Sequence, residues 1–212
     1  MIQTEVFNNN VEAYEVWYDE HKAVYESEIA ALRAQLEKLP ATLRGIEVGV
    51  GTGRFSKPLG IKEGIEPATE MADKAIRRGV EIIEGTAERL PYKDIQFDFV
   101  MFVTICHLSN VKAAFKEAYR VLKRGGSIIV GFLDKDQTIA RSYLEKRNQS
   151  TFYRNATFYT VTHIIKLLKE VKFIETEFNQ TLFGKLEDIK KIQEPKEGYG
   201  EGSFVVVKAI KR

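Results

Sequence analysis

Short apolar runs alternate with amphipathic segments along most of this chain, and this order predicts an α/β protein with a doubly wound, mostly parallel sheet. Residues 97–104 form a nearly continuous apolar run, which is typical of a strand buried on both faces. The last two strand-like runs have no helix between them, so we expect an antiparallel pair at one edge. The expected architecture is a three-layer αβα arrangement around seven strands.

Composition indicates one globular domain over residues 1–212, with 44% hydrophobic and 29% charged residues. The sequence contains no apolar stretch of 18 residues, and its first residues lack the apolar segment of a secretory signal. Cys106 is the single cysteine, so no intrachain disulfide can form and we expect a reducing, cytoplasmic compartment. The 32 basic and 30 acidic residues nearly balance, which argues against a nucleic-acid partner.

The N-terminal part, residues 1–40, is expected to form a helical cap. Apolar residues recur three to five positions apart over residues 11–39, which predicts one long amphipathic helix. Pro40 would end this helix.

The central part, residues 41–133, contains the alternation itself. We expect strands in five apolar runs, at residues 43–50, 64–66, 80–83, 97–104 and 127–133. Helices are expected between them, at residues 54–59, 69–78 and 110–123. Thr69 is a plausible N-cap and Gly79 a plausible residue just beyond the helix end, whereas Gly125 and Gly126 would close the last of these helices.

The C-terminal part completes the sheet. Residues 134–160 are polar with a helical patch at 137–146, and we expect them to form an insertion on the substrate side. Residues 161–212 would contribute a helix, predicted at 160–171, and the edge strands at 173–182 and 203–210.

Three features fall at the carboxyl ends of the first three predicted strands, where sheets of this kind bind ligands. They are the segment from Glu47 to Gly53, the acid Glu66, and the segment 86–88. Glycines let the backbone approach a ligand closely, and a carboxylate 17 residues after Gly49 can accept bonds from the two hydroxyls of a ribose. The pattern predicts a site for an adenosine compound.

The glycine spacing separates two kinds of adenosine ligand. A dinucleotide-binding turn requires a third glycine where this chain has Arg54, which disfavours a nicotinamide cofactor. The chain instead resembles the class I S-adenosylmethionine-dependent methyltransferases. The resemblance rests on the E-x-G-x-G-x-G pattern at 47–53, on Glu66-Pro67, on Gly85-Thr86-Ala87-Glu88-x-Leu90-Pro91, on Phe97-Asp98-x-Val100 and on residues 117–126.

The resemblance implies a Rossmann-like fold, S-adenosyl-L-methionine as cofactor, and a set of cofactor-binding residues. By this likeness Glu66 would hold the ribose, while Pro67 and Met71 would flank the adenine. The methionine end of the cofactor would contact Glu47, Gly49, Val50, Gly51, Thr52 and Gly53. The adenine amine would meet Thr86, Ala87 and Glu88, and the floor beneath the sulfonium would be Val103 and Thr104.

Three departures from the family pattern affect this picture. The link from Gly53 to Glu66 is short, so the first helix of the core is cut down. Thr86 stands where the family commonly has Asp, which would weaken or rearrange the adenine amine contact. Val171-Lys172 stands where a glycine usually precedes the next strand.

The acceptor side of the site is less marked. His107 follows the fourth predicted strand and is a candidate general base, although a loop histidine bonded to nearby backbone is the simpler interpretation. Tyr14 and Tyr18, with Trp17, could cap the pocket or pack the first helix onto the sheet. Tyr153 and Tyr159 are further candidates for substrate contact, and we expect Cys106 to be a buried structural thiol. A basic and aromatic patch at 141–154 could touch a nucleic acid, but a solvated face is the simpler reading.

The function expected from these residues is methyl transfer to a small-molecule acceptor by in-line displacement, without a metal. Residues 104–107 read Thr-Ile-Cys-His, and the motif by which this family methylates amino groups of nucleobases and glutamine is absent. Two alternatives stay open: a catalytically silent regulator that binds S-adenosylmethionine, and a nicotinamide-dependent oxidoreductase. The sequence leaves the acceptor and the oligomeric state undetermined.

Overall fold

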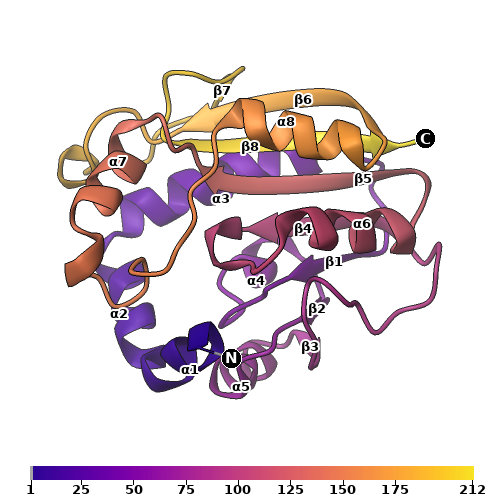
Figure 1. Cartoon of the computed structure of the whole chain (residues 1–212), viewed down its shortest axis with the longest axis horizontal. Helices are drawn as coiled ribbons and strands as arrows, with labels where there is room; N and C mark the ends of the chain where they lie inside the picture. The colour runs from indigo at the N-terminus through magenta and orange to yellow at the C-terminus, as the bar shows by residue number, and fades with distance from the viewer. Residues whose placement is uncertain (1) are drawn as a thin grey trace.

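One twisted sheet forms the middle layer of the structure, a computed structural model that describes residues 2–212 (Figure 1). Its strand order is β3-β2-β1-β4-β5-β8-β6-β7. The strands are β1 (Gly45–Val48), β2 (Glu63–Ile65), β3 (Glu81–Ile83), β4 (Phe97–Val103), β5 (Leu122–Leu133), β6 (Phe173–Thr181), β7 (Lys196–Glu197) and β8 (Phe204–Lys211). The sequence predicted seven strands; the eighth, β7, is a two-residue strand inside the polar segment before β8, too short to give an apolar pattern.

Helices cover both faces of the sheet, as the alternation predicts (Figure 1). They are α1 (Ile2–Asn9), α2 (Val11–Glu20), α3 (Lys22–Leu36), α4 (Ser56–Leu59), α5 (Thr69–Arg77), α6 (Val111–Val121), α7 (Thr138–Glu145) and α8 (Val161–Glu170), with 3-10 turns η1 (Ile105–His107), η2 (Arg147–Gln149) and η3 (Leu186–Asp188). Helices α6 and α8 pack on one face, and α3 packs on the other against β5, β8 and β6. Across residues 2–212, no helix has both the length and the apolar character needed to cross a membrane.

Strand β4 lies at the centre of the core. Phe97, Val100 and Phe102 join the apolar cluster beneath α6 and α8, whereas Phe99 and Met101 join the cluster beneath α3. The side chains of a strand alternate between the two faces of a sheet, so a strand between two helix layers needs apolar residues at nearly every position. The prediction that this run is buried on both sides is confirmed.

The two predicted C-terminal strands, β6 and β8, join the sheet as an antiparallel pair, as expected. Strand β8 lies between β5 and β6 and runs antiparallel to both. The four neighbours β3, β2, β1 and β4 are parallel to one another, and β4 is parallel to β5. The mostly parallel, doubly wound fold with an antiparallel edge is therefore confirmed.

The single helix predicted over residues 11–39 is wrong. The chain forms α2 and α3 with a break at His21, and α1 precedes them. The His21 ring stacks on Trp17 at 4.5 Å, and its Nδ1 lies 2.8 Å from the carbonyl oxygen of Trp17. The apolar spacing continues through the break, so periodicity could not reveal it. The bend lets α3 lie on the sheet while α2 turns toward the carboxyl ends of the strands.

Two other boundaries differ from the prediction. Strand β5 begins at Leu122 rather than at 127, so Gly125 and Gly126 lie within it, where the β4–β5 register shifts. A Cβ on Gly126 would stand 2.9 Å from the carbonyl oxygen of Asp98, so this glycine serves close strand approach. Helix α5 is capped by Ala68 without a side-chain bond, which makes Thr69 its first residue; Gly79 follows it at φ +87°, as expected.

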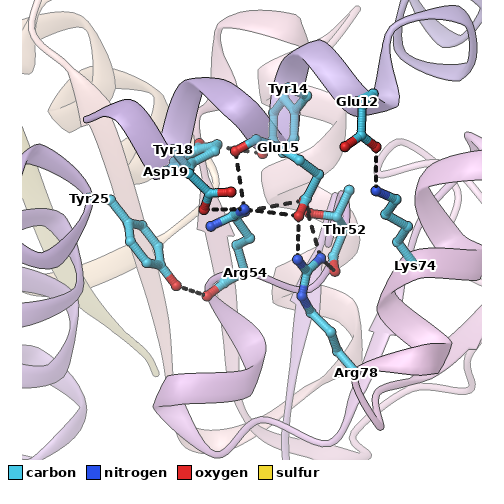
Figure 2. A network of polar contacts seen from close by, with 10 residues as sticks. All are labelled: Glu12, Tyr14, Glu15, Tyr18, Asp19, Tyr25, Thr52, Arg54, Lys74 and Arg78. Carbon is cyan, nitrogen blue, oxygen red and sulfur yellow. Dashed lines mark hydrogen bonds and ion pairs between the residues drawn. The ribbon is translucent and has the colours of Figure 1, made fainter. Parts of the chain in front are cut away.

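A buried carboxylate fastens α2 to the loop after β1 (Figure 2). Glu15 accepts hydrogen bonds from Arg54, at 2.9 Å to Nη2, from Arg78, and from the hydroxyl of Thr52. Arg78 also donates to the carbonyl oxygen of Thr52 at 2.6 Å, and Arg54 pairs with Asp19 at 2.8 Å. One carboxylate therefore joins three segments that lie far apart in the sequence, and it holds α2 over the ends of β1 and β2.

We predict that Glu15→Gln lowers the free energy of unfolding by about 3 kcal/mol, because it leaves two arginines without their buried partner. Burial opposes ionisation of Glu15, but hydrogen bonds from Arg78 and Arg54 outweigh it and lower the pKa from 4.5 to about 2. A lowered folded-state pKa gives stability that is complete above 4.5 and is lost as the pH falls toward 2. Denaturant unfolding between these pH values should show this loss in the parent protein and its absence in the variant.

Glu12→Gln is the matched control for this measurement. Glu12 lies on the same helix and pairs with Lys74 at 2.8 Å, but its side chain is 80% exposed. Exposed ion pairs contribute about 0–1 kcal/mol. Equal destabilisation by the two substitutions would contradict a special role for Glu15.

Candidate active site

A cavity of about 290 Å³ lies at the carboxyl ends of β1, β2 and β4. Helices α2, α3 and α7 and the segment at 152–153 also contribute to its wall. Most residues that the sequence nominated line this cavity: Tyr14, Tyr18, Glu47, Gly49, Val50, Gly51, Glu66, Pro67, Met71, Thr86, Ala87, Glu88, Val103, Thr104, His107 and Tyr153. The fold thus brings together segments from six parts of the chain.

Three nominated residues do not line the cavity. The Thr52 hydroxyl is turned to Glu15. Gly53 has φ +82°, and a Cβ there would stand 3.2 Å from the Cα of Ala75, so this glycine allows the loop to pack on α5. The Tyr159 ring lies against His163, with ring centres 5.4 Å apart. Thr52 and Gly53 therefore help to fix the shape of the glycine loop, but they do not form part of the cavity surface.

The glycine loop presents bare backbone to the cavity. Gly49 has φ +80°, and no heavy atom lies within 4 Å of the position that a Cβ would take there. Gly51 has φ +57°, and its Cβ would stand 3.3 Å from the hydroxyl of Tyr14. Side chains at these positions would be strained and would occupy space that a ligand can fill.

Glu66 closes the loop against the end of β2. Its Oε2 accepts a hydrogen bond from the Gly51 amide at 2.7 Å, and its Oε1 accepts one from the Ala68 amide at 2.8 Å. Burial raises the pKa of Glu66, although these two backbone bonds act in the opposite direction. Each carboxylate oxygen can accept a further bond, so a fixed pair of acceptors faces the cavity.

Glu47 is a second buried carboxyl at the cavity. Glu47 follows Ile46 in β1, and the Ile46 side chain points to the opposite face of the sheet. The Glu47 carboxyl accepts a hydrogen bond from the Ser56 hydroxyl. Burial raises its pKa to about 8; the Ser56 bond opposes this rise and the charge of Glu66 adds to it. A cation that entered the cavity would favour the ionised form of this group.

Glu28, on α3, is a third carboxyl at the cavity and was not nominated by the sequence. It is 8% exposed, and burial raises its pKa to about 8. Its side chain makes no hydrogen bond or ion pair to any described side chain of residues 4–212. A signal for it was present, because Glu28 stands four residues from both Val24 and Leu32 and so falls on the buried stripe of the helix.

Apart from the phenols and His107, the strongly buried ionisable groups of the cavity are carboxyls. No lysine or arginine occurs among its lining residues in the described part of the chain, whereas three buried glutamates do. The nearby Arg54 and Arg78 bind Glu15 instead. Such a cavity suits a cationic ligand, and it disfavours a phosphate-bearing nucleotide, whose negative charges would meet only carboxyl groups.

The loop after β3 forms a side wall. Ala87 and Met71 are buried there, and Thr86 is exposed. Glu88 accepts hydrogen bonds from the Ser109 hydroxyl at 2.7 Å and the Asn110 amide at 3.0 Å. This wall is therefore fastened to the start of α6.

The other end of the cavity is aromatic. His107 lies between Phe7, at 5.0 Å, and Tyr153, at 5.6 Å, and burial lowers its pKa to about 4. Its buried Nδ1 has no hydrogen-bond partner in the part of the chain that is described, so the loop-histidine interpretation lacks its backbone bond at this atom. Tyr143 and Phe152 also line this end and were not nominated individually.

The remaining candidates from the sequence are Cys106 and the basic patch at 141–154, and their contacts are those of structural residues. Cys106 packs with Ala140, Ala156 and Phe158, and burial raises the pKa of its thiol to about 12. Its placement agrees with a structural thiol. In the basic patch, the Arg147 guanidinium donates to the carbonyl oxygens of Arg154 and Ala156.

Comparison with known proteins decides the family. A family model described as a methyltransferase domain matches residues 46–130. A solved structure from Thermotoga maritima, reported as a SAM-dependent methyltransferase, possible histamine N-methyltransferase, superposes with a TM-score of 0.93. It is 42% identical in sequence, and the match covers 99% of this chain and 100% of that one. This chain belongs to the class I S-adenosylmethionine-dependent methyltransferases.

Two other matches extend the comparison of this methyltransferase. An uncharacterized protein of Methanocaldococcus jannaschii is 44% identical, over 97% of this chain and 98% of its own length. A Haemonchus contortus phosphoethanolamine N-methyltransferase, solved with S-adenosyl-L-methionine, has a TM-score of 0.63 at 18% identity, which shows a common fold; the match covers 84% of this chain and 51% of that one. S-adenosyl-L-methionine is the cofactor of the family, and the acidic cavity with its bare glycine loop fits this cationic molecule.

We predict that S-adenosylhomocysteine stabilises the methyltransferase, whereas NAD and ATP do not. A ligand at one hundred times its dissociation constant adds about 2.7 kcal/mol, which for a chain of this size raises Tm by about 5–10 °C. Thermal-shift measurements with the three compounds at equal concentration test the expectation. Equal stabilisation by NAD or ATP would contradict the argument from the cavity charges.

Proposed function

We propose that this methyltransferase moves the methyl group of S-adenosylmethionine to a small-molecule acceptor, by in-line displacement inside the cavity. The observation that carries the proposal is that the glycine loop with Glu66 and the aromatic end with His107 line one continuous cavity of about 290 Å³. The Thermotoga maritima relative supports the same class, because its reported name suggests a small amine as acceptor.

We propose the following division of the cofactor contacts. Glu66 accepts the ribose hydroxyls, and Pro67 and Met71 enclose the adenine, whose edge meets Thr86, Ala87 and Glu88. The methionine part lies along Glu47 and the backbone of residues 49–51, because Thr52 and Gly53 do not line the cavity. Val103 and Thr104 form the floor beneath the sulfur. This assignment is supported by Thr104, whose φ of +60° ends β4 abruptly at the cavity and whose amide donates to Gly131 at 2.9 Å.

We propose that residues 1–40 act as a helical cap and residues 134–160 as the substrate-side insertion on the core of residues 41–133, with residues 161–212 completing the sheet. The positions of Tyr14 and Tyr18 on α2, and of Tyr143 and Tyr153 in the insertion, support this division because all four side chains line the cavity. Their rings would exclude water from the reacting groups.

The reaction requires little covalent chemistry from the protein. Bound S-adenosylmethionine supplies a methyl group on a positively charged sulfur, and the C–S electron pair stays with the sulfur as the acceptor takes the carbon. The residues of the chain bind, orient and desolvate the two partners. Correct juxtaposition of two reactants contributes about 7–11 kcal/mol to such reactions.

His107 is our candidate for the group that takes the acceptor proton. A pKa of about 4 keeps the ring neutral at physiological pH, so it can accept a hydrogen bond or proton without first losing one.

Glu66→Ala should weaken binding of S-adenosylhomocysteine by about 2–3 kcal/mol, or about 30- to 150-fold, because charge-assisted bonds to the ribose are lost. Titration calorimetry measures the change. Glu70→Ala is the control, since Glu70 is an exposed glutamate on the adjacent helix. Glu66→Gln keeps one oxygen acceptor and guards against loss of the fold. Unchanged affinity in both Glu66 variants would show that the ribose contact is misassigned.

His107→Ala should reduce turnover by about 10²- to 10⁴-fold, the usual contribution of a general base, and leave the affinity for S-adenosylhomocysteine intact. Release of S-adenosylhomocysteine during incubation with a panel of small acceptors measures turnover. His163→Ala, an exposed histidine on α8, is the control. Full turnover in His107→Ala would dismiss the base. Tight cofactor binding without turnover in the parent protein, across a broad panel, would favour the regulator instead.

A further inference from the structure

Glu28 differs from the other two carboxyls of the cavity in having no partner. Ser56 donates to Glu47, and the amides of Gly51 and Ala68 donate to Glu66. Glu28 is 8% exposed, yet no hydrogen bond or ion pair to it occurs among the described side chains of residues 4–212. A buried polar group without a partner is destabilising, so a ligand that supplies the partner explains its presence best.

Aromatic rings surround the part of the cavity that Glu28 faces. Tyr143 and Tyr153 stack with ring centres 4.3 Å apart, and Tyr14 and Tyr18 meet edge to face at 5.0 Å. Burial raises the pKa of each of these four phenols, so they stay neutral at physiological pH. Aromatic faces attract organic cations, and a carboxylate among them adds a full negative charge.

Glu28 comes from a different part of the chain than the acids of the cofactor end, although Tyr14 lies near all three carboxyls. Glu47 and Glu66 come from the ends of β1 and β2, whereas Glu28 comes from α3 and faces rings on α2, on α7 and in the segment after η2. No lysine or arginine lines this end among the described residues either. An anionic acceptor would therefore find no cation to pair with at this end, and a neutral one would supply no charge to favour the ionised form of Glu28.

We propose that Glu28, with Tyr18, Tyr143 and Tyr153, forms the acceptor subsite of this enzyme and binds a small organic ammonium ion. The inference rests on the proposed transfer to a small molecule and adds the charge of that molecule and the residue that selects it. The Glu28 carboxylate pairs with the ammonium group, and the tyrosine rings enclose its hydrocarbon part.

The ionisation of Glu28 adds an independent readout. In the free protein burial raises its pKa to about 8, so much of the group carries a proton at pH 7. An ammonium ion favours the ionised form, so binding at pH 7 should release a proton, and affinity should rise as the pH approaches 8. The titratable groups with which Glu28 interacts are phenols, which stay neutral in this range: Tyr14, Tyr18, Tyr25, Tyr143 and Tyr153.

The test measures how small probes bind to the full chain saturated with S-adenosylhomocysteine. Each set of probes has a similar hydrocarbon part and a positive, a neutral or a negative end group. The probes are 2-phenylethylamine, 2-phenylethanol and 3-phenylpropionate, with butylamine, butanol and butyrate as a second, aliphatic set. We expect calorimetry to show that at least one amine binds at least tenfold more tightly than its alcohol and that the acids do not bind. The binding enthalpy of the amine should change with the ionisation enthalpy of the buffer, which would show that a proton is released.

Substitutions assign the effect to Glu28. Glu28→Gln should lower the affinity for the amine at least tenfold while leaving that for the alcohol and for S-adenosylhomocysteine unchanged. Glu28→Asp keeps the charge and should retain part of the preference, which also covers a failure of the first variant to fold. Glu26→Gln is the matched control, because Glu26 lies on the same helix, pairs with Lys22 and does not line the cavity.

The outcomes separate the two proposals. If S-adenosylhomocysteine fails to bind the parent protein, the proposed function itself is wrong. If it binds but neither amine binds, if each amine binds no better than its alcohol, or if Glu28→Gln leaves the preference intact, the ammonium subsite is wrong and the methyltransferase proposal stands.

Discussion

The carboxylate of Glu66 joins the two segments on which the site depends. Its oxygens bind the amides of Gly51 and Ala68, so the loop after β1 and the turn after β2 are held together by one side chain. The neighbouring Gly49 and Val50 amides donate to the carbonyl oxygen of Ile65, which fixes the loop a second time. The glycines can adopt the positive φ values that this geometry requires, and their lack of side chains leaves the cavity open beside Glu66.

Charge is divided between the inside and the outside of this loop. Arg54 and Arg78 lie close by but turn to Glu15, on the side of α2, and their positive charge is neutralised there (Figure 2). The cavity keeps Glu28, Glu47 and Glu66 without a basic neighbour among the described lining residues. The network that fastens the N-terminal helices thus also keeps the cavity acidic, which links the stability of the cap to the preference for cationic ligands.

Local pattern predicted the cofactor end well and the acceptor end poorly. Glycines, an acid at the end of β2 and apolar strands are encoded within short stretches, because each is required by the backbone of one turn or by burial on both sheet faces. The acceptor end is assembled from α1, α2, α3, α7 and the segment at 152–153, which lie far apart in the sequence. Glu28 illustrates the difference: its place in an apolar stripe marked it as unusual, but only the packing of Tyr143 and Tyr153 beside it gave that feature a meaning.

The sequence by itself determined most of the alternation of strands and helices in the core, the doubly buried β4 and the reversed edge pair, because these follow from periodicity and turn chemistry along contiguous residues. The motifs at residues 47–53, 66–67 and 85–91 carried the resemblance that identified the cofactor. Only the tertiary structure decided the break at His21, the extension of β5 through Gly125 and Gly126, and the burial of Glu15 between two arginines. It also decided that Glu28 has no hydrogen-bond partner among the described side chains. The physical reason is the same in each case. These features depend on contacts between residues far apart in the chain, and their free energy exceeds the local preferences that a sequence pattern records.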